Sequence, residues 1–342
     1  MSIFSSQSVI TEHISEADLR AYFVGFDFGK YRYDDLTKVL MKAVVDFAFG
    51  FHAGILEKYT DEILKEAAQS IYNIKDFSEV KWIYVDNNSS LSDEDLKNEK
   101  KYLKRGEFGE LILHVLLRDF ANTIPLLSKI YFKDTDGVTV HGFDGIHIGK
   151  NAFGTGDSLY FGETKFYARA NDKAGEAGVK DLIDDVREHF KRDFLKREFS
   201  LIGKKKYAYL PLDEYEDKNT IESYENFINQ KKYWYQKISD AEKGTITLDS
   251  FLNSVTIPLL CTYESALLTK YNDTNNPDFL REYNEQIKDL QTIFKNNLKL
   301  IEVELGEPIR TNLNIVLLLF PIPNKKELVK LLHEKLYHRA NL

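Results

Sequence analysis

The sequence predicts a mixed α/β fold with a core of one helix, three strands, a second helix and a further strand. With 342 residues, 43% of them hydrophobic and 13% aromatic, the chain has the composition of a globular protein with a large core. From residue 105 onward, a segment with helical spacing is followed by short aromatic and β-branched segments, and helical spacing then returns. We therefore expect the element order αβββαβ.

The first helix of this core is predicted at residues 105–118. Residues 111–117 are apolar on nearly every side, which is typical of a buried helix. Spacings of three, four and four residues place its polar side chains on one stripe: Glu107, Glu110, His114 and Arg118. The stripe either faces solvent or turns Glu110 towards a site inside the protein. Gly109 would allow another backbone to come close.

The three strands are predicted at 126–133 and in a hairpin whose arms surround Asp144 and Glu163. Gly, Asn, Asp and Ser residues between 149 and 158 indicate the connecting loop. Side chains alternate between the two faces of a strand, so Glu163 and Lys165 should share a face and Thr164 should take the other. The second helix is expected at 178–190, with a further strand at 207–212.

The segments outside this core are predicted from the same periodicities. We expect strands at 19–28, 80–85, 254–263 and 315–320, and helices at 33–49, 60–72, 220–241, 278–298 and 325–339. Pro258 would confine the strand at 254–263 to an edge of the sheet or give it a bulge. The helix at 220–241 should face solvent. Ser92 is a candidate N-cap in the polar segment 86–99, where we place a boundary between an N-terminal αβ domain (1–98) and a second domain (99–342).

Composition restricts the class of protein. The single Cys261 excludes an internal disulfide framework and suits a reducing compartment. No secretory signal is recognisable, and no apolar segment approaches the ~20 residues of a membrane span. We therefore expect a cytoplasmic protein without membrane contact.

A net charge of −8 argues against a generally basic surface, but residues 187–206 contain eight Lys and Arg residues. Four of them are candidates for contacts with DNA phosphates: Lys191, Arg192, Lys196 and Arg197. The alternative is a solvated helix face followed by a charged loop.

The two hairpin carboxylates, Asp144 and Glu163, are the candidate catalytic groups of the chain. A carboxylate in an apolar strand is costly without a partner, and neighbouring carboxylates are stabilised by a shared cation. Oxygen ligands from Asp144 and Glu163 suit Mg²⁺ or Mn²⁺, and Lys165 would add a compact positive charge beside the metal. This combination indicates attack of water on a phosphodiester. A structural salt bridge between strand residues is the alternative.

A helix with Glu110, a strand with Asp144, a strand with Glu163-Thr164-Lys165 and a following helix resemble the core of the PD-(D/E)xK nuclease superfamily. Phe143 stands where that motif has proline, and 18 residues separate Asp144 from Glu163. The resemblance implies a restriction-endonuclease-like αβββαβ core with helical insertions. It also implies that Asp144 and Glu163 are metal ligands, that Lys165 orients or activates water, and that Glu110, or its rival Glu107, is a supporting carboxylate.

More narrowly, residues 143–148, 159–167 and the helix after them resemble the nuclease subunits of the Hachiman anti-phage defence system, from about residue 100 to the C-terminus. This implies a Mg²⁺-dependent DNA endonuclease or nickase that works with a superfamily 2 helicase. Two alternatives remain: a catalytically inactive nuclease-like subunit that binds DNA or protein, and a restriction-type nuclease that acts alone.

Overall fold

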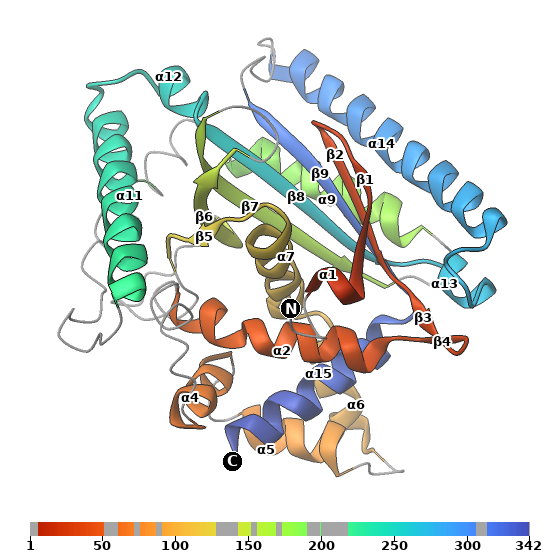
Figure 1. The fold of residues 1–342 in the computed structure, drawn as a ribbon. Helices are drawn as coiled ribbons and strands as arrows, with labels where there is room; N and C mark the ends of the chain where they lie inside the picture. Colours follow the sequence, from red (N-terminus) through yellow and green to blue (C-terminus); the bar gives the residue numbers. More distant parts are fainter. Residues whose placement is uncertain are drawn as a thin grey trace.

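The computed structural model describes residues 6–50, 61–71, 76–86, 91–127, 143–151, 156–168, 173–189, 199, 218–305 and 313–341. A twisted sheet lies at the centre, with helices on both of its faces (Figure 1). Helices from both ends of the chain gather below the sheet in the view of Figure 1, where α2 and α15 lie close together.

Seven strands in the described residues form one sheet in the order β1-β2-β9-β8-β7-β6-β5. They are β1 (Ile10–Ser15), β2 (Leu19–Val24), β5 (Ile124–Pro125), β6 (Gly145–Lys150), β7 (Asp157–Tyr167), β8 (Val255–Glu264) and β9 (Asn314–Ile322). Strands β2, β9, β8 and β7 are parallel neighbours, whereas β1, β6 and β5 pair antiparallel. A small separate ribbon joins β3 (Phe26–Asp27) to β4 (Lys30–Tyr31).

The mixed α/β fold is confirmed: α7 (Glu107–Phe120), β5, β6, β7 and α9 (Ala174–His189) follow one another in the described residues, and β8 comes after further helices. The first strand was predicted too late, because β5 covers only Ile124–Pro125, and residues 126–127 form a bend. The rest of that predicted strand (128–133), and the strand predicted at 207–212, lie outside the described residues. The next strand in the described residues is β8, much later in the chain.

The N-terminal strands belong to the same sheet as the core. Strand β2 pairs with β9 in parallel, with Leu19 opposite Leu317. The division into domains at residue 98 stays a prediction.

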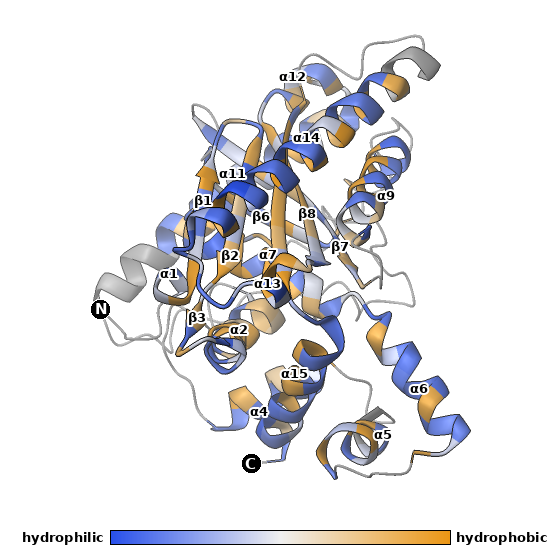
Figure 2. Ribbon diagram, turned by 90° about the vertical axis from the view of Figure 1, so that its right-hand side faces the viewer, coloured by the Kyte–Doolittle hydropathy of each residue, from blue (hydrophilic) through white to orange (hydrophobic). Residues whose placement is uncertain are grey.

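Alternation along the strands separates two hydrophobic cores. On β7, Leu159 and Phe161 pack with α9 and α14 (Pro277–Leu305), whereas Tyr160 packs on the opposite face with α7 and α2 (Tyr33–Phe49). The central strands are hydrophobic along most of their length, as expected for strands that are covered on both faces (Figure 2).

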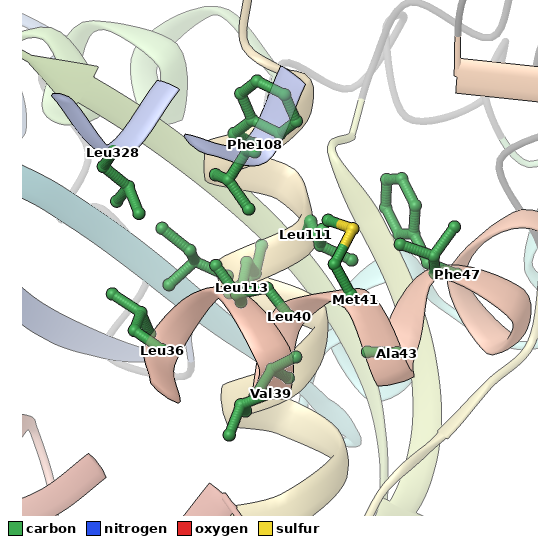
Figure 3. Close-up of a cluster of buried hydrophobic side chains, with 14 of the residues drawn as sticks. Leu36, Val39, Leu40, Met41, Ala43, Phe47, Phe108, Leu111, Leu113 and Leu328 are labelled. Atoms are coloured by element: carbon green, nitrogen blue, oxygen red, sulfur yellow. The ribbon is translucent and has the colours of Figure 1, made fainter. Parts of the chain in front are cut away.

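The remaining helices surround these layers. They are α1 (Ser6–Val9), α4 (Asp61–Ile71), α5 (Asp76–Val80), α6 (Asp93–Leu103), α11 (Lys218–Lys243), α12 (Leu248–Leu252), α13 (Leu267–Lys270) and α15 (Lys325–Ala340). Apolar side chains of α2, α7 and α15 interdigitate under the sheet and fix α7 in place (Figure 3). Ser92 caps α6 as predicted, through a capping box with Asp95. No helix in the described ranges is both long and apolar enough to cross a membrane.

Two predictions about strands were wrong. Residues 80–85 are helical, with a π-helical turn at Lys81–Val85, because the buried Val80, Ile83 and Tyr84 follow helical spacing and Tyr84 stacks on His333. Strand β8 is central, between β7 and β9, although it contains Pro258. The β7–β8 pairing is interrupted beside this proline, between Tyr160↔Thr256 and Glu163↔Leu259, so its missing N–H is tolerated.

Helix α11 also differs from its prediction, because one side of it is buried. Phe227, Trp234 and Ile238 are each at most 2% exposed and follow helical spacing, whereas Tyr233 is 54% exposed. Trp234 and Tyr235 therefore pack in the core, whereas Tyr233 does not.

Candidate active site

The predicted carboxylates meet where β6 separates from β7. The antiparallel pairing begins at Gly145↔Gly162, so Asp144 stands just before the strand and next to Glu163. The backbone N–H of Asp144 donates to the Gly162 carbonyl, and its Oδ2 accepts a hydrogen bond of 2.9 Å from the Thr164 N–H. The Asp144 carboxylate thereby continues the pairing of β7 after the partner strand has ended.

Glu163 and Lys165 lie on the face of β7 that α9 covers, as predicted from strand alternation, and both have partners on that helix. Glu163 is 3% exposed, and its Oε1 lies 2.6 Å from His189 Nδ1. The Lys165 ammonium lies 2.6 Å from Asp185 Oδ2. One step further along β7, the Tyr167 hydroxyl donates to Asp181. Three consecutive residues of one strand face are therefore each bound to α9.

This ladder of three contacts follows from the dimensions of the two elements. Two residues along a strand advance about 6.6 Å, and four residues along a helix advance about 6 Å. The strand residues 163, 165 and 167 therefore match the helix residues 189, 185 and 181 when the helix runs back along the strand. Gly178 brings α9 close, since a Cβ there would lie 2.6 Å from Cys261 Sγ on β8.

The charges near Lys165 stabilise its protonated form. Burial alone would lower its pKa, but the hydrogen bond and charge of Asp185, together with Glu163 and Asp144, raise the pKa of Lys165 above its ordinary value. Both predicted metal ligands are thus close enough to act on this ammonium group. Burial raises the pKa of the neighbouring Asp181, and Lys165 opposes that shift.

Helix α7 covers the opposite face of β7 and approaches it through glycines. A Cβ at Gly109 would lie 3.0 Å from Thr164 Oγ1, and one at Gly162 would lie 2.8 Å from Leu113 Cδ2. Helix α7 thus comes close to β7 at Gly109, although the nearest atoms belong to side chains and not to the backbone. Glu110 is 8% exposed and lines a cavity of about 20 Å³ together with Asp144, so the solvent-facing alternative is wrong for Glu110. Glu107 is instead paired with Arg105, at 2.9 Å.

The same cavity is lined by two buried histidines. His114 Nδ1 lies 3.2 Å from His147 Nε2, and His147 Nδ1 lies 2.9 Å from Thr123 Oγ1. Burial lowers the pKa of His147 to about 3 and lowers that of His114 as well. Both rings are therefore neutral at pH 7. The Nε2 of His114 has no hydrogen-bond partner in the described part of the chain.

The donor atoms at the strand junction fit a magnesium ion held by few protein ligands. Asp144 and Glu163 offer carboxylate oxygens from adjacent strands, and Mg²⁺ is commonly held by one or two carboxylates together with water and phosphate oxygens. Within the described residues, no three His, Cys, Asp or Glu side chains lie close enough to share a metal. The role of Glu110 as a supporting carboxylate stays a prediction.

Sequence reasoning missed Asp185 and His189. Their spacing with Asp181 (four residues each) was a possible signal, but it became meaningful only with the register of α9 on β7. The four predicted DNA contacts lie outside the described residues: Lys191, Arg192, Lys196 and Arg197.

Comparison with known proteins places nearly the whole chain in one family. The sequence profile named HamA matches residues 2–336. A search of curated proteins finds no match.

Proposed function

We infer that this chain, a member of the HamA family, is a component of the Hachiman anti-phage defence system. We propose that it is the metal-dependent DNA endonuclease or nickase of that system. It would act in the cytoplasm under the control of a partner superfamily 2 helicase. The observation that carries this proposal is the meeting of Asp144, Glu163 and Lys165 at the β6–β7 junction. Two carboxylates and a lysine suit phosphodiester hydrolysis.

Each residue has a distinct role in this proposal. Asp144 and Glu163 would hold Mg²⁺ (or Mn²⁺), and Glu110 would support them from α7. Bound there, the metal would polarise the phosphate and lower the pKa of water. Lys165 remains protonated at neutral pH and would orient the attacking water or balance charge on the phosphate. Asp185 and His189 would position Lys165 and Glu163, respectively.

A plasmid-nicking assay tests the activity. The protein is purified alone and with the neighbouring helicase, and each preparation is incubated with supercoiled DNA and Mg²⁺ or EDTA. We expect Mg²⁺-dependent nicking by the wild type, and loss of it in Lys165→Ala. Lys150→Ala is the matched control, because Lys150 is an exposed lysine (82% for its side chain) on the adjacent strand β6. Equal loss in both variants would count against the proposal.

Thermal melts test metal binding independently of cleavage. Mg²⁺ or Mn²⁺ should raise the wild-type melting temperature by mass action and leave Asp144→Asn nearly unchanged. In EDTA, the Asn variant should melt no lower than wild type, because two neighbouring carboxylates repel each other. If metal stabilises Asp144→Asn as much as wild type, Asp144 is not a ligand.

One observation favours the alternative of a nuclease-like subunit without catalysis. Glu163 and Lys165 already have protein partners, His189 and Asp185. An inactive subunit would still bind DNA or the helicase, but it would nick DNA in neither preparation of the assay. A restriction-type nuclease acting alone would cut in both.

A further inference from the structure

A groove between α2 and α15, far from the β6–β7 junction in sequence, is lined mainly by basic side chains. It encloses about 310 Å³ and is lined by Lys38, Met41 and Lys42 of α2 and by Lys335, His338 and Arg339 of α15. On each helix the three residues are spaced i, i+3 and i+4, so each helix contributes one turn as a wall. The two helices pack together under the sheet (Figure 1).

The local charge of the groove is opposite to that of the whole chain, which is −8. Four Lys and Arg side chains and His338 line the groove. Two carboxylates of the first turn of α2 lie within 4.0 Å of lining lysines. Asp35 lies 3.4 Å from Lys38 but also binds Arg32 at 3.0 Å, and Asp34 lies 4.0 Å from Lys335. Among the described residues, two carboxylates thus stand beside four Lys and Arg side chains of the lining.

Arg339 is held in a fixed position in this groove. Its Nη1 donates a hydrogen bond of 2.6 Å to the carbonyl of Met41, which fixes the guanidinium against α2. No carboxylate pairs with Arg339 within the described residues. Burial lowers the pKa of Arg339, which is the mark of a desolvated positive charge. An anion in the groove would offset that cost through charge-assisted hydrogen bonds.

We propose that this groove binds phosphate groups, with Arg339 and the lysines of both helices as their ligands. The phosphates would come from a single nucleic-acid strand or from a free nucleotide, which present the same oxyanions. Arginine and lysine together are the residues that proteins use for phosphate recognition. Among the described lining residues, Met41 is the apolar one. A docked peptide would need more apolar anchoring than one methionine offers.

Another hollow shows the contrast. It encloses about 740 Å³ beside α9 and α14, and its charged lining is mostly acidic: Glu176, Glu282, Glu285, Asp289 and, with opposite charge, Arg281. Like charge would repel phosphates there. The groove between α2 and α15 has a mainly basic described lining, and the hollow has a mainly acidic one. We therefore assign phosphate binding to the groove.

Fluorescence anisotropy with a labelled dT12 strand tests the proposal, in EDTA so that cleavage does not interfere. Lys42→Gln/Lys335→Gln should weaken binding roughly tenfold at low salt and reduce the log–log salt slope by about 1.4, or about 0.7 for each lost contact. This variant leaves the half-buried Arg339 in place, so folding is preserved. The matched control is Lys288→Gln/Lys299→Gln, which removes two exposed lysines from α14.

Competition separates the sources of phosphate. Displacement of dT12 by pyrophosphate or ATP at similar phosphate concentration supports a nucleotide site, whereas displacement by unlabelled strands alone supports a nucleic-acid site. Unchanged affinity and slope in Lys42→Gln/Lys335→Gln would overturn the proposal. Polyglutamate that competes as well as phosphate at equal charge would overturn it too, in favour of an acidic protein segment.

The binding result does not depend on the proposed nuclease activity, because dT12 binding is measured in EDTA, without metal and without cleavage. Loss of nicking with normal dT12 binding would test only the proposed cleavage site. Loss of dT12 binding in Lys42→Gln/Lys335→Gln would test only the proposed groove.

Discussion

The two faces of β7 carry different kinds of side chain and make different contacts with the helices that cover them. Towards α7 the strand presents Gly162 and Thr164, and the helix comes close enough that added side-chain atoms would collide. Towards α9 it presents Glu163, Lys165 and Tyr167, each bound to a polar side chain of that helix. The first face is specialised for close packing, and the second holds ionisable groups in fixed positions.

The comparison also separates two ways of burying polar groups. On the α7 side, His114 and His147 are neutral, because burial disfavours their charged forms. On the α9 side, Lys165 stays charged because Asp185 compensates the cost of burial. Metal-dependent chemistry needs charged ligands, so we expect substitutions of the ionisable groups on the α9 side to change activity and substitutions of the two neutral histidines on the α7 side to change stability.

The largest expected effect distinguishes two adjacent residues. Glu163→Gln keeps a hydrogen-bonding group near His189 but removes the charge, so cleavage should fall by several orders of magnitude. Thr164→Val is the control on the opposite face. Its Oγ1 has no hydrogen-bond partner in the described structure, so losing it should leave cleavage and stability nearly unchanged. Nicking rates and circular dichroism of both variants measure this, and similar rates would contradict the comparison.

A smaller effect is expected from the helix side of the ladder. Asp185→Asn removes the charge that holds Lys165, and kcat should fall by about 10–100-fold while KM for DNA changes little. Asp185→Glu should restore part of the rate, because it returns a carboxylate. Asp184→Asn is the matched control, since Asp184 is largely exposed and pairs with Arg187. Single-turnover kinetics measure the cleavage rate of each variant. An equal loss of rate in Asp184→Asn would show that Asp185 has no specific role in the site.

The histidines of the α7 side predict a dependence of stability on pH. The pKa of His147 is about 3 in the folded protein and about 6.5 when unfolded, so between these values the unfolded state binds more protons. Its contribution to stability is fully present above pH 6.5 and is lost as pH falls towards 3, by about 1.4 kcal/mol per pH unit. In urea unfolding at pH 5, 6 and 7, the unfolding free energy of His147→Gln should change less with pH than that of the wild type. An unchanged dependence on pH would mean that His147 is not buried as a neutral ring.

The sequence was sufficient for the parts of this site that depend on local periodicity. Alternation placed Glu163 and Lys165 on one face, and the apolar α7 segment was recognised as buried. Two failures had tertiary causes. Pro258 indicated an edge strand because its N–H is missing, but the interrupted pairing beside β7 removes that conflict. Asp185 and His189 could not be assigned, because their role depends on how α9 lies along β7.

The smallest expected effect tests the closeness of α9 itself. In Gly178→Ala, the new Cβ would lie 2.6 Å from Cys261 Sγ, and overpacking of this kind costs about 1–3 kcal/mol. Alanine favours a helix by about 1 kcal/mol over glycine, so the net loss of unfolding free energy should be about 1 kcal/mol. Gly109→Ala on the α7 face meets Thr164 Oγ1 at 3.0 Å and should lose less. Adding Cys261→Ala should recover the loss in Gly178→Ala but not in Gly109→Ala, since only the first contact involves the thiol. Equal recovery in both backgrounds, measured by urea unfolding, would show that Cys261 does not set the distance between α9 and the sheet.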